Sequence, residues 1–330
     1  MRIVVAPDKF RGTADAATVA GALGGVLRDL GHEVVEVPMA DGGEGTLEAL
    51  GGANRTTVVS GPLGDPVEAA WRLSDRTAVI EMSQASGLLV VGGAEANDPV
   101  AATTYGTGEL VLDAAEKGAR RIVVGLGGSA TTDGGLGALR AMYPVQRFKG
   151  VELVVACDVT TRFVDAARVF APQKGAGPAQ VELLERRLAA LVDVYRTDYG
   201  VDVAEVPGAG AAGGLAGGLL CAGGQLVPGV ELVGDLVGLW DAVEEADLVV
   251  TGEGLLDAES FDGKVVGGVA GLALDLGVPT VAVVGAVDPE GLDQVLPAEL
   301  RVVSLTEECG ASRSVQDVVG CLREVASTLV

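Results

Sequence analysis

The sequence is poor in the residues on which most hydrolases and zinc domains depend. It contains one histidine, His32, and four cysteines, Cys157, Cys221, Cys309 and Cys321, which lie far apart and form no CxxC pair. His32 falls between a predicted helix and a predicted strand, so Ser-His-Asp and Cys-His catalysis are disfavoured. The scattered cysteines indicate neither a disulfide framework nor a zinc site. We therefore expect a reducing, cytoplasmic compartment.

Long hydrophobic runs and an excess of positive charge are also missing. The most apolar later stretch, 265–287, is interrupted by Asp275 and Pro279, and the opening run from Ile3 to Ala6 is too short for a signal-peptide core. The formal net charge of −23 repels nucleic-acid phosphates and anionic lipid surfaces. We expect a small-molecule substrate, no nucleic-acid partner and no membrane partner, and a homodimer is left open.

Aromatic residues make up only 3% of the chain, whereas glycine reaches 50 residues and hydrophobic residues 48%. Most of that hydrophobic content is Val, Leu and Ala, which is typical of parallel strands alternating with helices and joined by tight glycine turns. A length of 330 residues exceeds the size at which single cores usually stop growing. The composition therefore predicts an α/β protein with two domains.

Both ends of the chain show the same alternation of strand and helix. The opening predicts a strand over 3–6, a helix over 14–30 and a strand over 33–37. The closing part predicts strands over 248–250, 280–284 and 302–303, with helices over 266–276 and 315–329. This alternation favours one doubly wound parallel sheet built from both ends.

The middle of the chain has a mixed pattern. Two β-rich runs, 56–60 and 67–73, flank a Gly/Pro turn and predict an antiparallel hairpin, to which 77–81 adds a strand. Helices over 106–117 and 181–195 and strands over 121–124 and 152–156 follow. We therefore expect a discontinuous flavodoxin-like domain, 1–55 and 236–330, with a second mixed α/β domain, 56–235, inserted into it.

Acidic and basic residues follow four of the predicted strands. Ligands of open α/β sheets bind beyond the carboxyl ends of the strands, where carboxylates can hold magnesium or accept a proton. Any single Asp has about even odds of being only a helix N-cap, but four such places together favour a site. The residues concerned are Asp8 and Arg11; Asp41, Gly42, Gly43 and Glu44; Asp158; and Glu253, Asp257 and Lys264.

Two glycine-rich loops could cradle an anion. The first, 125–135, offers Gly127, Gly128, Ser129 and Thr131 between a predicted strand and helix. The second, 207–214, matches GxGxxG through Gly208, Gly210 and Gly213, although tight helix packing explains such glycines equally well. Lys174 is either a cation that meets a phosphate or a substrate carboxylate, or a solvated loop lysine. A P-loop consensus is absent, and no acidic residue closes a second Rossmann strand, so a nicotinamide dehydrogenase is the lesser hypothesis.

Taken in order, the motifs resemble those of the class I bacterial glycerate kinases over nearly the whole chain. They are APDKFRG from Ala6, ADGGEGT from Ala40, YGTGE from Tyr105, GLGGSAT from Gly125, CDVT from Cys157, PQKGA from Pro172, GAGAAGG from Gly208 and TGEG from Thr251. The resemblance implies a flavodoxin-like domain with an inserted α/β domain. It also implies that ATP, with Mg2+, phosphorylates D-glycerate to 2-phosphoglycerate in an interdomain cleft.

For this reaction we assign proton transfer to Asp41, Asp158 and Asp8, and magnesium binding to Asp133 and Asp158. The sequence departs from the family pattern at several places: Arg11 replaces Lys, Thr132 replaces Asn, Leu255 replaces Arg, Thr161-Arg162 replaces Asn-Pro, and the segment 143–151 is short. The alternative is a catalytically lapsed or altered homologue that binds another small hydroxy acid. A nicotinamide-dependent dehydrogenase ranks below both.

Overall fold

The computed structural model describes all 330 residues, and these form two compact units. The first unit contains Met1–Asp41, Glu48–Gly51 and Pro228–Val330, and the second contains Gly42–Leu47 and Gly52–Val227. The short helix α2 (Thr46–Ala49) is divided between them. Each unit has a β-sheet and hydrophobic clusters of its own.

The first unit is built on a five-stranded sheet in the order β11-β10-β9-β1-β2, in which every neighbouring pair is parallel. Its strands are β1 (Arg2–Pro7), β2 (Glu33–Glu36), β9 (Leu248–Leu256), β10 (Thr280–Val287) and β11 (Arg301–Ser304). β1 pairs with β9 from Ile3 opposite Leu248 to Pro7 opposite Gly252. The first and last parts of the chain therefore share one sheet, and all carboxyl ends lie at the same edge.

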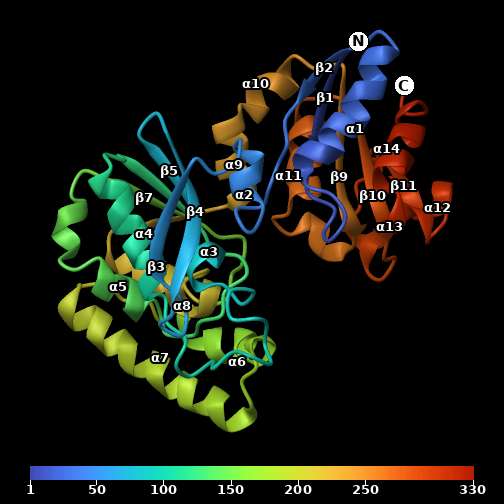
Figure 1. The fold of residues 1–330 in the computed structure, drawn as a ribbon. Helices are drawn as coiled ribbons and strands as arrows, with labels where there is room; N and C mark the ends of the chain where they lie inside the picture. The colour runs from blue at the N-terminus through green and yellow to red at the C-terminus, as the bar shows by residue number, and fades with distance from the viewer. The chain divides into compact units, whose positions relative to one another are not determined.

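Helices cover both faces of this sheet because successive strand residues are apolar on both sides. Ile3 and Val5 pack with α1 (Ala16–Asp29) and α14 (Val318–Ala326), whereas Val4 lies with α9, α10 and α11 (Figure 1). The other helices of this unit are α9 (Gly229–Val237), α10 (Leu239–Glu244), α11 (Val265–Asp275), α12 (Leu305–Cys309) and α13 (Arg313–Gln316). The predicted doubly wound α/β class is confirmed.

The closing helix differs from the prediction of one helix over 315–329. The backbone leaves the helical region at Asp317, with φ −136° and ψ 53°, and separates α13 from α14. The Asp317 carboxylate accepts a hydrogen bond from the Gly320 amide at 3.1 Å and so caps α14. Asp317, which lies inside a helical pattern in the sequence, thus marks the start of a second helix.

The second unit is built on a six-stranded sheet in the order β3-β4-β5-β6-β7-β8. Its strands are β3 (Arg55–Ser60), β4 (Pro66–Ser74), β5 (Thr77–Glu81), β6 (Arg121–Gly125), β7 (Glu152–Ala156) and β8 (Gln225–Val227). β3, β4 and β5 pair antiparallel, as the Gly/Pro turn predicts, and β5 to β8 pair parallel. The prediction missed β8, which has only three residues.

Two hydrophobic clusters organise the helices of this unit. One surrounds the buried Trp71 of β4 and joins the sheet to α4 and α8, and the other joins α6, α7 and α8 around Phe163 and Tyr195 (Figure 1). The helices are α3 (Ser83–Ser86), α4 (Tyr105–Glu116), α5 (Leu136–Ala141), α6 (Ala166–Phe170), α7 (Pro178–Asp198) and α8 (Ala211–Cys221). No helix in either unit has the combined length and apolarity needed to cross a bilayer.

Candidate functional site

The first unit brings three of the predicted carboxylates together at the carboxyl edge of its sheet. Asp8 directly follows β1, and its amide donates to the Gly252 carbonyl of β9 at 2.8 Å. Glu253 is the next residue of β9. Asp41 follows β2 after a segment held to β1 through the Met39 amide, which donates to the Pro7 carbonyl at 2.9 Å. Parallel pairing of β1 with both neighbours therefore produces the cluster.

Burial sets the protonation of two of these side chains. Only 9% of Asp8 and 8% of Glu253 is exposed. Loss of hydration raises the pKa of Asp8, the Lys9 ammonium opposes the rise and the Asp41 carboxylate supports it, and the resulting pKa is about 6. Burial likewise raises the pKa of Glu253, a hydrogen bond from Ser260 and the Lys264 charge oppose the rise, the Asp8 charge supports it, and the resulting pKa is about 7. The Glu253 Oε1 atom is buried without a hydrogen-bond partner. The edge thus holds two carboxyls that titrate near neutral pH.

Two lysines, Lys9 and Lys264, lie near this carboxylate cluster. Lys9 Nζ lies 3.6 Å from Asp8 Oδ1. Arg11 is exposed, and its loop lies against Gly254, where an added Cβ would be 3.3 Å from the Arg11 amide. Lys264 Nζ lies 3.6 Å from Asp257 Oδ1, which itself accepts from the Ser260 amide at 3.0 Å. Asp257 is therefore a 3-10 helix cap that also holds Lys264 near Glu253.

The first glycine-rich loop packs against the loop that contains Gly42, Gly43 and Glu44. A Cβ at Gly125 would clash with the Gly42 carbonyl oxygen, and a Cβ at Gly127 would be 2.8 Å from the Glu44 amide nitrogen. Gly125 and Gly127 thus allow two backbones to approach closely. The tip, Gly127 to Ser129, stays partly exposed, with Gly128 in the left-handed region at φ +70°. This tip is the part of the loop that a ligand can reach.

The second glycine-rich loop is mainly a packing element. A Cβ at Gly210 would clash with the Arg162 carbonyl and one at Gly213 with the Thr131 carbonyl, while one at Gly208 would be 3.0 Å from Cys157 Sγ. Ala212, Gly213 and Gly214 adopt left-handed backbone angles at the start of α8. All three are buried. These contacts support the helix-packing explanation of the GxGxxG match.

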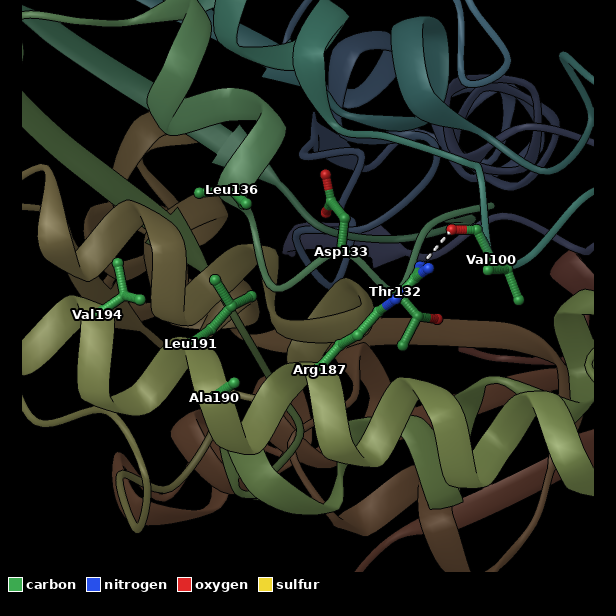
Figure 2. A pocket seen from close by; sticks show the side chains of 8 residues that line it. All are labelled: Val100, Thr132, Asp133, Leu136, Arg187, Ala190, Leu191 and Val194. Atoms are coloured by element: carbon green, nitrogen blue, oxygen red, sulfur yellow. Dashed lines mark hydrogen bonds between the residues drawn. The ribbon is translucent and has the colours of Figure 1, made fainter.

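Asp133 lies at the start of α5 in a dense set of hydrogen bonds. Its carboxylate accepts from the Thr104 amide at 2.8 Å and the Thr104 hydroxyl at 2.9 Å, and from the amides of Gly135 and Gly137 at 3.1 Å each. In Figure 2 its side chain extends away from α7. These bonds join the 103–104 segment to α5, so Asp133 has a structural role that sequence reasoning did not assign to it.

Lys174 is buried rather than solvated, with only 2% of the residue exposed. Its Nζ donates to the Thr131 carbonyl at 2.6 Å, and burial lowers its pKa to about 7 although Asp133 opposes the shift. Asn97 Nδ2 donates to the carbonyls of Ala130 and Lys174 at 3.0 and 2.9 Å. The Lys174 side chain therefore binds the backbone of the first glycine-rich loop at Thr131. Asn97, which the sequence analysis did not single out, joins the same loop to the backbone of Lys174.

Asp158 follows β7 and is partly buried. Beside it, Cys157 Sγ lies 3.3 Å from the Val159 carbonyl, and burial raises the pKa of this thiol, so it is unsuited to act as a nucleophile. Glu81 is a further buried carboxylate that the sequence analysis missed. It accepts from the amides of Gly45 and Leu47 at 3.0 and 2.8 Å, and burial raises its pKa. It anchors the loop that begins at Gly42.

The carboxylates of the first unit can supply part of the ligand shell of a magnesium ion, but not all of it. No group of three or more acidic, histidine or cysteine side chains converges into a cage made by protein alone. Mg2+ characteristically takes one or two carboxylates and completes its shell with phosphate oxygens and water. Glu253 Oε1, which has no hydrogen-bond partner, is an oxygen atom of that kind.

Comparison with known proteins gives the same relationship at three levels. The model of the glycerate kinase family matches residues 3–143 and 144–329, and this break adjoins the short 143–151 segment. Glycerate 2-kinase of Escherichia coli K12 is 38% identical over 377 aligned positions, covering 100% of this chain and 98% of the relative. Glycerate kinase of Halalkalibacterium halodurans is 39% identical over 354 positions, covering 92% of each chain.

A crystal structure assigned to glycerate kinase 2 of Salmonella typhimurium LT2 superposes with a TM-score of 0.84 at 35% identity. The match covers 100% of this chain and 98% of that one. Sequence and fold therefore agree along the whole length. This chain belongs to the glycerate kinase family.

Proposed function

We propose that this protein transfers the γ-phosphoryl group of ATP to the 2-hydroxyl of D-glycerate and releases 2-phosphoglycerate and ADP. Family membership supports the reaction class. The observation that carries the proposal is the pair of buried carboxyls, Asp8 and Glu253, whose pKa values are raised to about 6 and about 7 at the ligand-binding edge of a parallel sheet.

In the proposed step, the 2-hydroxyl oxygen attacks the γ-phosphorus while the bond between that phosphorus and the β–γ bridging oxygen breaks. The hydroxyl proton passes to a carboxylate, and ADP leaves with the electron pair of the broken bond. A base works best when its pKa lies near the operating pH. We assign this role to Asp8, because it combines a pKa of about 6 with the nearby Lys9 ammonium that stabilises its charged form.

In this proposal the second unit binds the phosphates, and the first unit binds the glycerate carboxylate. The exposed tip Gly127 to Ser129 offers backbone amides to the phosphates, with Lys174 positioning the loop behind it. Arg11 of the first unit is accessible to the glycerate carboxylate. When bound, Mg2+ would offset the phosphate charge, and we place its protein ligands at Asp41 and Glu253, with Asp158 as a further candidate.

The domain assignment belongs to the same proposal. We propose that the two compact units correspond to the discontinuous domain expected over 1–55 and 236–330 and to the inserted domain expected over 56–235. The unit borders lie at 41/42, 47/48, 51/52 and 227/228, so the loop that begins at Gly42 goes with the inserted part. The Glu81 contacts with Gly45 and Leu47 give the physical reason. We also propose a cytoplasmic location, where ATP is available.

The test is ADP release by the purified full-length protein, followed by a coupled assay, with phosphorus NMR of the product. We expect release only when ATP, Mg2+ and D-glycerate are all present, and a 2-phosphate product. Asp8→Asn should lower turnover by about two to four orders of magnitude, the range for loss of a positioned acid or base. It should still bind ADP.

Three results would change the proposal. ADP release that is the same with and without glycerate, or greater with another hydroxy acid, would favour the altered homologue. Binding of NADH, seen as enhanced nicotinamide fluorescence, would favour a dehydrogenase. Near-normal turnover by a folded Asp8→Asn protein would remove Asp8 as the base while leaving the reaction class in place.

A further inference from the structure

Glu81 is a buried carboxylate of the second unit that takes no direct part in the proposed reaction step. It ends β5, only 4% of it is exposed, and its register partner on β6 is Gly125, the first residue of the first glycine-rich loop. Its Oε1 accepts from the Leu47 amide at 2.8 Å and from the Gly45 amide at 3.0 Å. Burying a carboxylate is costly unless it is hydrogen-bonded, so these two amides make its burial tolerable.

This carboxylate holds the segment 42–47, which lies directly against the first glycine-rich loop. A Cβ added at Gly125 would collide with the Gly42 carbonyl oxygen, and one added at Gly127 would be 2.8 Å from the Glu44 amide nitrogen. The two backbones are therefore in contact with no side chain between them. Because packed backbone cannot absorb a shift, a displacement of the segment 42–47 would also displace Gly127.

The turn that follows β5 binds the tip of the same loop. The Leu88 amide donates to the Gly128 carbonyl at 2.8 Å, and the Ala130 amide donates to the Ser86 carbonyl at 2.9 Å. By contrast, no backbone carbonyl accepts from the amides of residues 127–129. Adjacent amides around a left-handed residue, here Gly128 at φ +70°, form a concavity that suits an anion. The tip is thus braced by its neighbours while its own amides stay available.

We propose that Glu81 is a positioning residue for phosphoryl transfer, which fixes the amides of residues 127–129 by holding the segment 42–47 against their loop. The inference rests on the proposed function, since it takes this tip as the phosphate-binding element. Glu81 acts through the reach of its side chain, because the two amides need an acceptor oxygen at the Oε1 position. Burial raises the pKa of Glu81, so its surroundings do not favour the charge itself.

Two substitutions separate the reach of this side chain from its charge. Glu81→Gln keeps the length and an acceptor oxygen but has no charge, whereas Glu81→Asp keeps the charge but is one methylene shorter and cannot reach both amides. The kcat and the KM values for ATP and D-glycerate are measured on the full-length protein with Mg2+. Glu81→Gln should stay within about threefold of wild type, because it still accepts both bonds.

Glu81→Asp should impair the use of ATP. We expect kcat to fall about tenfold to a hundredfold and the KM for ATP to rise about fivefold, because a misplacement of about 1 Å is enough for such losses. The KM for glycerate should not change. In the protein without nucleotide, hydrogen exchange should become faster over 44–47 and 127–130 in Glu81→Asp but not in Glu81→Gln.

Asp113→Ala is the matched control for a general loss of stability. The Oδ2 atom of Asp113 on α4 accepts from the Thr57 hydroxyl of β3 and from Lys117 Nζ, each at 2.6 Å, so its partners belong to neither loop. This variant should lower the urea midpoint, as Glu81→Asp does, but leave the three kinetic constants and the exchange over 127–130 unchanged. If Glu81→Asp does not fold, Glu81→Gln alone decides.

The outcomes separate this proposal from the proposed function. If wild type phosphorylates glycerate but a folded Glu81→Asp protein has a normal kcat and KM for ATP, the positioning role is wrong and the reaction stands. Loss of turnover by a folded Glu81→Gln protein would mean that the charge matters, which also overturns the role. If wild type neither binds ADP nor releases it from ATP, the proposed function fails and the positioning role fails with it. Impaired Glu81→Asp beside normal Glu81→Gln and Asp113→Ala supports the role.

Discussion

At the scale of single residues, Glu253 is a candidate site residue whose burial lowers the free energy of unfolding when its carboxylate is charged. Its side chain is buried, its Oε1 has no hydrogen-bond partner, and burial raises its pKa from 4.5 to about 7. Between these two pH values the folded protein holds a proton here that the unfolded chain has lost. The contribution of Glu253 to the free energy of unfolding is therefore fully present below about pH 4.5. It is lost as the pH rises to about 7 and does not return above that pH.

Glu253→Gln should consequently stabilise the protein at alkaline pH. The substitution removes the buried charge, so at pH 8 we expect a gain of up to about 3 kcal/mol in the free energy of unfolding, from 1.36 kcal/mol per pKa unit. At pH 4 we expect little difference. Urea unfolding at both pH values measures this.

The control is Glu259→Gln, because Glu259 is exposed and paired with Lys264 at 3.3 Å. It should show no comparable gain at pH 8. A Glu253→Gln protein that is less stable than wild type at pH 8 would mean that the charged carboxylate is well accommodated, and the functional reading of its burial would lose its main support.

At the scale of elements, glycine has two roles that the sequence alone does not separate. The 207–214 loop matches a nucleotide fingerprint, yet Gly210 and Gly213 are surrounded by backbone from 162 and 131. The signal that could have shown this is long-range, since Arg162 and Thr131 are far away in sequence. The local spacing of the glycines predicted a loop followed by a helix correctly. It could not predict which distant residues pack against those glycines.

Gly213→Ala should be strongly destabilising for this reason. Gly213 has φ +68°, and a Cβ would collide with the Thr131 carbonyl that also accepts from Lys174. Strain in the left-handed region alone costs roughly 1–2 kcal/mol, and the collision adds to it. Urea unfolding should show a loss of at least about 2 kcal/mol, or no folded protein.

The control for this prediction is Gly21→Ala in the middle of α1. Gly21 is exposed and a Cβ there meets nothing within 4 Å. Replacing a helical glycine by alanine should therefore stabilise by roughly 0.5–1 kcal/mol. Equal effects of the two substitutions would show that the 131–213 contact is looser than the structure indicates.

At the scale of the whole molecule, the sequence predicted the fold well because strand and helix periodicity is a local property. Shared use of one sheet by Ile3–Ala6 and Leu248–Val250 followed from matching alternation at both ends, and β1 does pair with β9. The site was harder, because burial is a property of the packed protein. Lys174 was predicted as a ligand contact or a solvated lysine; it is buried, so it is not solvated, and its ligand contact stays a prediction. Asn97 and Glu81 belong to no motif that the sequence analysis recognised.

The division of work between the two units predicts where each substrate protects the backbone from hydrogen exchange. The residues that we assign to the phosphates, Gly127 to Ser129 with Lys174 behind them, lie in the second unit, whereas Asp8, Arg11 and Glu253 lie in the first. Each unit has its own sheet and clusters, so local opening in one need not open the other. With ADP and Mg2+ we expect slowed exchange first over 125–136.

Adding D-glycerate alone should instead slow exchange at residues 8–14 and 252–257, which surround the carboxylate cluster. Exchange is followed by mass spectrometry of peptic fragments, with β10 and α14, which carry none of the proposed binding residues, as internal references. ADP protection centred on β9 and the Asp8 loop, with 125–136 unchanged, would place the nucleotide in the first unit. The assignment of phosphates to the glycine-rich tip would then have to be abandoned, because a loop that binds phosphate through its amides cannot do so without slowing their exchange.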